Sequence, residues 1–188
     1  MKTFYYIILA SIIALSSCKK ENTDVCNDNL KYFNTKDAKY CIPHGYLFYG
    51  GPWSNFENMY SFGLIFNSDD ININLKDTTF SGKGESISFM VLCPTEYLST
   101  DTYPFYKFDT IPAISGAGYY KNYDFTKHYK MGVDDELPGD FANISSGLLS
   151  INEYTNGEYA ISFDGMDENG DSISAEYNGE LIYIDYSK

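Results

Sequence analysis

Arginine and glutamine are absent from the 188-residue chain, and histidine and tryptophan are scarce, with two residues and one. All 13 basic residues are lysines, and 26 acidic residues bring the net charge to −13. Nucleic-acid binding depends on cationic contacts with phosphate, so this composition argues against nucleic acid as a partner. Charged residues make up only 21% of the chain, which separates it from disordered acidic tails.

The sequence also has no apolar run of about 20 residues, the length that a membrane-spanning helix needs. The longest run, residues 4–15, follows Lys2 near the start of the chain. A positive residue before an apolar run of this length is typical of a secretory signal peptide. What remains is long enough for one domain with a buried core.

The last residue of this run and the three that follow carry a lipidation motif. Leu15-Ser16-Ser17-Cys18 resembles the lipobox of bacterial lipoproteins, a leucine and two small residues before a cysteine. The resemblance implies removal of residues 1–17 as a lipoprotein signal peptide and acylation of Cys18. Several acyl chains on one residue anchor a protein firmly in a lipid bilayer. The alternatives are an ordinary signal peptide or an uncleaved anchor that Cys18 follows by chance.

The residues after Cys18 bear on localisation. Lys19 stands where an aspartate would resemble an inner-membrane retention signal, so we expect the outer membrane, with the periplasmic and cell-surface faces both open. After cleavage 12 lysines face 26 acids, a net charge of −14, which anionic lipid repels. Residues 18–38 are predicted to form a polar tether and residues 39–188 the folded domain.

Three cysteines remain besides Cys18, and an exported compartment permits disulfides. Cys26 and Cys41 are close in sequence and form the predicted pair. Closing a loop of about 15 residues stabilises a fold by roughly 3 kcal/mol. Cys93 ends an apolar segment and is predicted to be a small buried side chain. The alternative is three unpaired thiols, and no zinc site or other cofactor is expected.

The part after the tether has the pattern of an all-β protein. Strand-like segments in its first two thirds are residues 46–49, 60–66, 71–75, 87–93 and 102–108. Ser81-Gly82-Lys83-Gly84 is predicted to be a turn between two of them. Pro104 lacks a backbone N–H, which places its segment at a sheet edge.

The C-terminal third shows the clearest strand pattern. Apolar residues alternate in 148–151, 159–163 and 173–183, and turns are expected at Asn156-Gly157 and residues 167–170. We expect residues 173–183 to be one long strand kinked at Gly179, because the alternation continues through Asn178-Gly179. The predicted fold is an antiparallel β-sandwich or flattened barrel that ends in a β-meander.

This arrangement is similar to that of small Bacteroidota outer-membrane lipoproteins of unknown function. In that group a lipobox precedes a β-sandwich, a Gly-x-Gly turn leads into an apolar strand, and a meander closes the chain. The matching pieces here are Gly82-Lys83-Gly84 before Ile87, and residues 147–185. The resemblance implies the fold and the envelope location, and it carries over no catalytic residue.

Three short segments resemble Bacteroidota O-glycosylation targets, in which a serine or threonine follows an aspartate. The acceptors that this resemblance implies are Thr78, Thr110 and Ser172. The alternative is that these residues only form turns, which Asp-Thr and Asp-Ser pairs favour.

The Asp-rich segment 164–176 was compared with an EF-hand calcium loop. A weak calcium site there would use Asp164, Asp167, Asn169 and Asp171. Gly165 supplies no ligand at the first loop position, and no flanking helices are expected. A hairpin turn is therefore the primary interpretation of this segment.

Signatures of catalysis are lacking, since the sequence has no G-x-S-x-G elbow and no P-loop. His44 lies in a predicted turn and His128 in an aromatic-rich stretch, and neither has a partner that the sequence identifies. No catalytic residue is predicted, and the protein is not expected to be an enzyme.

Aromatic residues are in surplus, at 18% of the chain with 19 tyrosines. Flat rings beside amides and carboxylates stack on sugar C–H groups, which makes Trp53, Tyr119, Tyr120 and Tyr123 candidate ligand-binding residues. The alternative is that these rings pack the core. We therefore expect a lipid-anchored envelope protein with a binding or structural role toward a glycan or a protein. The other hypotheses are a pilin-like assembly subunit and a hydrolase of envelope or extracellular polymers.

Overall fold

The computed structural model describes most of the chain from residue 30 onward. The described residues are 30–53, 58–106, 112–125, 129–130, 140–154 and 157–187, with the backbone alone at 129, 130 and 140. They form strands and turns, and this part of the chain contains no α-helix. The prediction of an all-β fold is confirmed.

Thirteen strands follow one another in the described residues. They are β1 (Lys31–Asn34), β2 (Lys39–Cys41), β3 (His44–Pro52), β4 (Tyr60–Asn67), β5 (Ile71–Asn74), β6 (Thr79–Cys93), β7 (Asp101–Pro104), β8 (Ala113–Asp124), β9 (Tyr129–Lys130), β10 (Asp140–Glu153), β11 (Glu158–Asp167), β12 (Ser172–Glu180) and β13 (Ile182–Asp185).

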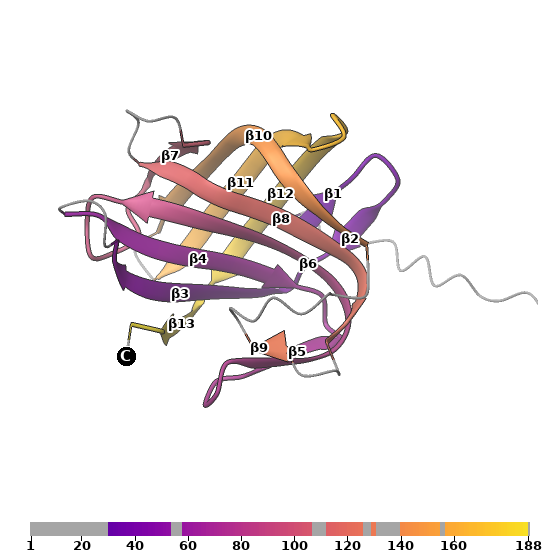
Figure 1. Cartoon of the computed structure of the whole chain (residues 1–188), viewed down its shortest axis with the longest axis horizontal. Coiled ribbons are helices and arrows are strands. Elements are labelled where there is room, and N and C mark those ends of the chain that lie inside the picture. Colours follow the sequence, from indigo (N-terminus) through magenta and orange to yellow (C-terminus); the bar gives the residue numbers. More distant parts are fainter. Residues whose placement is uncertain are drawn as a thin grey trace, which may run out of the picture.

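These strands make one strongly curled sheet, a half-barrel, in the order β13-β3-β4-β6-β8-β10-β11-β12-β1-β2 (Figure 1). Every neighbouring pair on this path is antiparallel except β13 and β3, which run parallel. The long strand β10 carries the sheet around the bend, because its first residues pair with β8 and the rest with β11. A front layer, β3-β4-β6-β8, therefore lies across a rear layer, β10-β11-β12-β1 (Figure 1).

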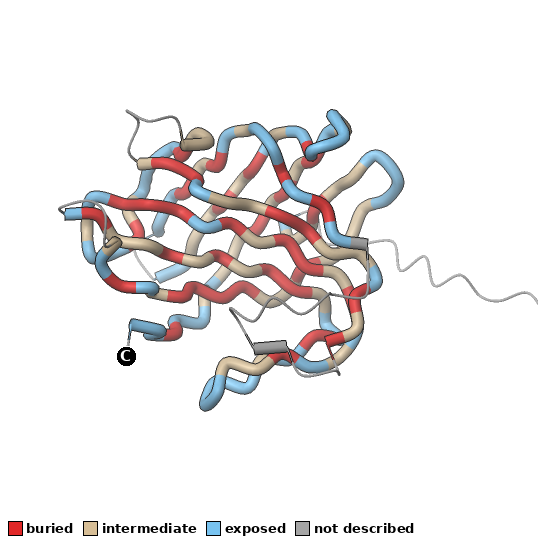
Figure 2. Tube along the Cα trace, viewed as in Figure 1, coloured by how far each residue is buried: buried red, intermediate tan, exposed pale blue. Residues whose placement is uncertain are grey.

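The main core lies between the two layers. Buried and less buried residues alternate along the front strands, as period-two side-chain placement requires (Figure 2). Ring pairs join the layers: the centroids of Phe89 and Phe163 are 4.9 Å apart, and those of Phe66 and Tyr177 are 4.8 Å apart. This concave face is the hydrophobic centre of the domain.

A second, smaller core lies on the opposite, outer face of the front layer. The small sheet of β5, the first residues of β6 and β9 folds back over that face. Its Phe80 and Ile71 are buried with Tyr123 and Phe125 from the end of β8 and with Tyr46 from β3. One long strand, β6, thus belongs to both cores.

The predicted turn at residues 81–84 is wrong, because these residues lie inside β6. Gly82 has a φ of +99°, and a Cβ there would lie 1.8 Å from the carbonyl oxygen of Asp70. Glycine here allows β6 to bend from the small sheet into the large one. The chain reverses instead at residues 75–78, where Thr78 has a φ of 55°.

The C-terminal meander agrees with its pattern. β10, β11 and β12 pair in sequence, with turns at Gly157 and at residues 167–170, and no hairpin forms at Gly179. The long last strand is interrupted at Leu181 rather than only kinked. Beyond Leu181, β13 leaves the rear layer and joins the edge of the front layer beside β3.

The domain begins before residue 39, so the predicted extent of the tether is wrong. β1 pairs with both β12 and β2, and Phe33 is fully buried and stacked on Tyr40 with ring centroids 4.9 Å apart. The polar residues around Phe33 had suggested a tether. Burial of the Phe33 ring in the core nevertheless holds this segment in the sheet.

The cysteines that the structure describes differ in state. Cys41 is disulfide-bonded, but its partner lies outside the described residues, as do Cys18 and Cys26, so the Cys26–Cys41 pairing stays a prediction. Cys93 is a free and fully buried thiol, as predicted, with Sγ 3.3 Å from the Tyr103 hydroxyl. Among the described residues no helix is long and apolar enough to cross a membrane.

Candidate functional site

The outer face of the front layer carries small side chains where the inner face carries large ones. Strand register aligns its residues in rows across the sheet, and the middle row is Ile65, Ser88, Gly118 and Asn143. The row on one side is Gly63, Met90 and Gly116, and the row on the other is Asn67, Ser86, Tyr120 and Phe141. The glycines and serines at the centre of these rows make that part of the face low, and the larger Ile65, Met90, Tyr120 and Phe141 border it.

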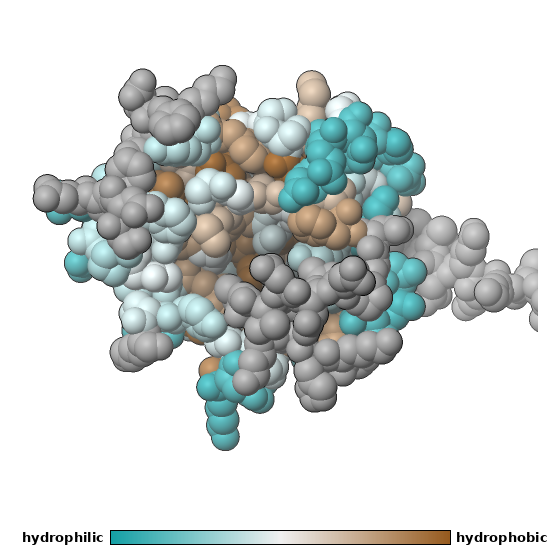
Figure 3. Space-filling model, in the orientation of Figure 1, coloured by the Kyte–Doolittle hydropathy of each residue, from teal (hydrophilic) through white to brown (hydrophobic). Residues whose placement is uncertain are grey.

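A groove of about 400 Å³ occupies this low region and is called the outer groove below. Its floor contains glycines and serines of β4, β6 and β8, and its walls contain Phe80, Met90, Tyr120, Phe125 and Phe141. Figure 3 shows this face, with apolar side chains gathered over its middle. No charged residue is among the described residues that line the groove.

The aromatic walls hold one another in place. The ring of Tyr120 lies 4.8 Å from that of Phe141 and 4.9 Å from that of Tyr123, between centroids. Phe125 continues the same cluster, because its ring centroid lies 6.1 Å from that of Tyr120 and 5.4 Å from that of Phe80, on which it stacks. Rings fixed by their neighbours lose little freedom on binding, which suits a preformed ligand site.

The glycines of the floor differ in the space around them. A Cβ on Gly116 would meet no heavy atom of the described residues within 4 Å, so these residues leave the groove open above it. A Cβ on Gly118 would lie 2.6 Å from the ring of Phe141, so glycine lets that ring rest against the floor. Gly116 thus marks free volume, and Gly118 is required by packing.

A second cavity, of about 290 Å³, lies on the other side of Phe141 and is called the polar pocket below. It is lined by residues of the β1–β2 turn, β8, the start of β10 and the β11–β12 turn: Thr35, Lys36, Asp37, Tyr119, Lys121, Phe141, Ala142, Asp167, Asn169 and Asp171. The turn residues come from opposite ends of the sequence, and the pairing of β1 with β12 brings them together.

Asp167 is the buried carboxylate of the polar pocket, with 2% of its surface exposed. Its Oδ1 accepts the backbone N–H groups of Asn169 and Asp171, each at 2.9 Å, and its Oδ2 accepts the Tyr119 hydroxyl at 3.0 Å. Burial acts to raise the pKa of Asp167, but these hydrogen bonds outweigh it and the pKa is lowered. Burial and the bond to Asp167 raise the pKa of Tyr119.

The two lysines of the polar pocket are paired with carboxylates. Lys36 forms an ion pair with Asp171, and Lys121 Nζ lies 3.5 Å from Asp37 Oδ2. The pocket therefore contains three carboxylates and two ammonium groups, and Asp167 is the carboxylate that takes part in neither of these two ion pairs.

The four predicted ligand-binding rings do not gather on one surface. Tyr119 is buried in the main core and Tyr123 in the second core, so neither offers a free face to a ligand. Tyr120 is half-buried and forms a wall of the outer groove. Trp53 is half-buried at the end of β3, away from that groove, with its backbone N–H bonded to Met59 O at 2.7 Å.

The predicted calcium ligands are placed in a hairpin turn and the strand before it. Asp164 is exposed on β11, while Asp167, Asn169 and Asp171 make the hydrogen bonds and the ion pair described above. In the described part of the chain, no three His, Cys, Asp or Glu residues are grouped as a metal site requires.

The remaining predicted sites are only partly described. Thr78 is half-buried in the turn between β5 and β6, and Ser172 is exposed at the start of β12. Thr110 and His128 lie outside the described residues. His44 Nε2 lies 3.1 Å from Asp69 Oδ1 in an exposed pair.

Most of the groove residues, above all Phe80, Phe125, Phe141 and Gly116, were not predicted from the sequence. A signal was present in the paired small residues Ser86 and Ser88, which alternate with large apolar ones in β6. Recognising a groove would have required knowing which strands are neighbours. In comparisons with known proteins, no family model, no curated protein and no solved structure matches this chain.

Proposed function

We propose that this protein is a lipid-anchored, non-enzymatic binding protein of the cell envelope, held in the outer membrane through Cys18. The sequence motif at residues 15–18 supports the anchor. The outer groove supports the binding role, and it is the observation on which this role rests. Its volume of about 400 Å³ falls in the range of small-molecule sites.

The chemistry of the groove favours a small, largely apolar ligand over a polymer. Its walls are aromatic rings and methionine, and its lining carries no charge. Polar groups are few: Ser88 Oγ lies 3.4 Å from the carbonyl oxygen of Gly118, and Asn143 Nδ2 donates to Glu168 at 3.1 Å. A glycan needs many hydrogen-bond partners in its site, whereas an apolar body needs only surface to cover.

The binding role is tested with N-phenyl-1-naphthylamine, an uncharged apolar dye whose fluorescence rises on binding. We expect saturable binding to the wild-type protein at one site. Gly116→Leu places an isobutyl group in the groove, where a Cβ meets no atom of the described residues within 4 Å. This variant should lower the affinity by at least roughly tenfold.

Ser162→Leu is the matched control. Ser162 pairs with Ser150 and Glu176 on the rear layer, so this substitution introduces the same isobutyl group away from the groove. It should bind the dye as the wild type does. Equal affinity of Gly116→Leu and wild type would overturn the assignment of the groove.

The anchor is tested separately by metabolic labelling with a fatty-acid analogue. Wild-type protein should take up the label and fractionate with the outer membrane, and Cys18→Ala should do neither. An unlabelled wild-type protein would overturn the proposed anchor.

A further inference from the structure

The outer groove and the polar pocket meet at one side chain. Phe141 lines both cavities, and its ring contacts Tyr120 on the groove side. Residue 121, the next after Tyr120 on β8, is a lysine that lines the polar pocket. Figure 3 shows the apolar side chains of this face bordering directly on a group of hydrophilic ones.

The two cavities differ in charge. The groove lining has no charged side chain, whereas the pocket lining has five. A molecule that fills only the groove makes no use of the charged pocket. A molecule charged along its whole length would lose the hydration of its charged groups in the apolar groove. A ligand with an uncharged body and a charged end matches both cavities.

The extent of the groove across the strands suits a long, narrow ligand. The middle row of its lining, from Ile65 to Asn143, runs across β4, β6, β8 and β10, which are neighbours in the sheet. Strands lie about 4.8 Å apart, so the row is about 14 Å long and ends at the strand that carries Phe141. An unbranched apolar chain laid across the strands would bring its end to the pocket.

The charge of the pocket determines the sign of that end. Lys36 and Lys121 are each paired with an aspartate, and Asp167 is left as the additional carboxylate. The pocket therefore carries a net charge of −1, in a chain whose overall charge is also negative. Both the local and the long-range field attract a cation.

We propose that the outer groove and the polar pocket bind one amphiphile, with its apolar chain in the groove and an amine-bearing head in the pocket. This inference rests on the proposed binding function of the groove and specifies the class of ligand. The head would lie among Asp37, Asp167 and Asp171, and the chain would pass Phe141 onto the floor at Gly118 and Gly116.

The test compares three ligands with the same chain and different heads, each kept below its micelle concentration: dodecylamine, dodecanol and dodecanoate. Isothermal titration calorimetry on the wild-type protein at neutral pH should give the tightest binding for dodecylamine. We expect a preference of roughly tenfold over dodecanol and a larger one over dodecanoate.

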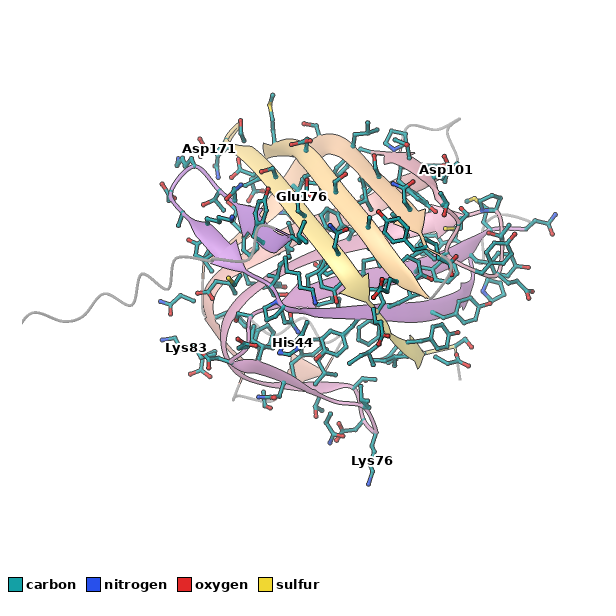
Figure 4. The ribbon with its side chains drawn as sticks, turned by 180° about the vertical axis from the view of Figure 1, so that it is seen from behind. His44, Lys76, Lys83, Asp101, Asp171 and Glu176 are labelled. Carbon is teal, nitrogen blue, oxygen red and sulfur yellow. The ribbon has the colours of Figure 1, made fainter. Side chains whose placement is uncertain are left out.

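The double variant Asp37→Asn/Asp171→Asn turns the net charge of the pocket from −1 to +1 and leaves the groove untouched. Dodecanoate should then bind more tightly than dodecylamine, while the affinity for dodecanol stays unchanged and shows that the fold is intact. Asp101→Asn/Asp164→Asn is the matched control, since it changes the total charge equally on exposed residues outside the pocket. Figure 4 shows Asp101 at the opposite end of the molecule from Asp171.

The outcomes separate this inference from the proposed function. Equal binding of the three ligands, all weakened by Gly116→Leu, would refute the amine-bearing head and leave the groove as a binding site. Binding of none of the three by wild-type protein would overturn both. A reversal that the control double variant also produces would assign the preference to overall charge and refute the role of the pocket.

Discussion

The inner and outer faces of the front strands differ in the size of the side chains that alternate along each strand. On the inner face, β4 and β6 place Phe62, Leu64 and Phe66 opposite Ile87, Phe89 and Val91, all of them buried. On the outer face, the same strands place the smaller Gly63, Ser86 and Ser88 beside Ile65, Asn67 and Met90. The inner face closes the core, and the outer face leaves a volume that the fold does not need to fill. Stability and binding are thus assigned to opposite sides of one layer.

The largest effect should come from opening the inner face. Phe66 is 1% exposed and its ring packs on Tyr177 of the rear layer, so Phe66→Ala leaves a cavity between the layers. We expect the free energy of unfolding to fall by about 3–5 kcal/mol. Urea denaturation followed by circular dichroism measures it, and a loss below 1 kcal/mol would contradict the assignment of this face as the core.

A smaller effect is expected where the inner face meets the polar pocket. Asp167→Asn replaces an ionised acceptor of three hydrogen bonds by a neutral amide, and should cost about 1–2 kcal/mol at neutral pH. The pKa of Asp167 is lowered in the fold, so its contribution is present above the unfolded value near 4 and is lost as pH falls through the folded value.

The difference in stability between the wild type and Asp167→Asn should therefore shrink when pH is lowered from 6 toward 2. Denaturant midpoints measured across this range test it. A difference that stays constant, or one that grows in acid, would show that the lowered pKa does not contribute to stability.

Asn67 is the exception on the outer face, because it is fully buried and neither polar atom of its side chain has a hydrogen-bond partner among the described residues. Asn67→Leu keeps a similar volume and removes the unpaired polar atoms, so it should raise the free energy of unfolding by about 1 kcal/mol. Thermal unfolding would show an increase in Tm. A decrease would indicate that the amide has a partner that a leucine cannot replace.

The smallest effect on stability is expected at Gly116. Gly116→Val adds a β-branched side chain to a strand and meets no atom within 4 Å at its Cβ. The free energy of unfolding should rise, by less than about 0.5 kcal/mol, because glycine is unfavourable in strands. A loss above 1 kcal/mol in urea denaturation would mean that the groove is packed rather than open.

The sequence predicted the parts of the fold that depend on alternation alone. The strands around residues 46–49, 60–66 and 148–183 followed from period-two patterns, and the hairpin turn at residues 167–170 followed from its Asp-Glu-Asn-Gly. The turn at residues 81–84 failed because glycines that bend a strand look like glycines that end one. The start of the domain failed because one buried ring, Phe33, outweighs a polar surrounding.

The candidate site was much less accessible to sequence reasoning. A surplus of tyrosine was visible, but whether Tyr119, Tyr120 or Tyr123 is exposed depends on the register of β8 and on the second core. The groove joins β4, β6, β8 and β10, and the pocket joins the β1–β2 turn to the β11–β12 turn. Such neighbours are set by the pairing order of the sheet, which no local pattern contains.

The most direct test of the outer groove as the binding site is an amide chemical-shift map of the ¹⁵N-labelled protein titrated with N-phenyl-1-naphthylamine. The account predicts shift changes concentrated at Gly63, Ser88, Gly116 and Gly118, with the rear-layer amides of Ser150 and Ser162 unchanged. Shifts spread over both layers, or confined to the rear layer, would contradict it.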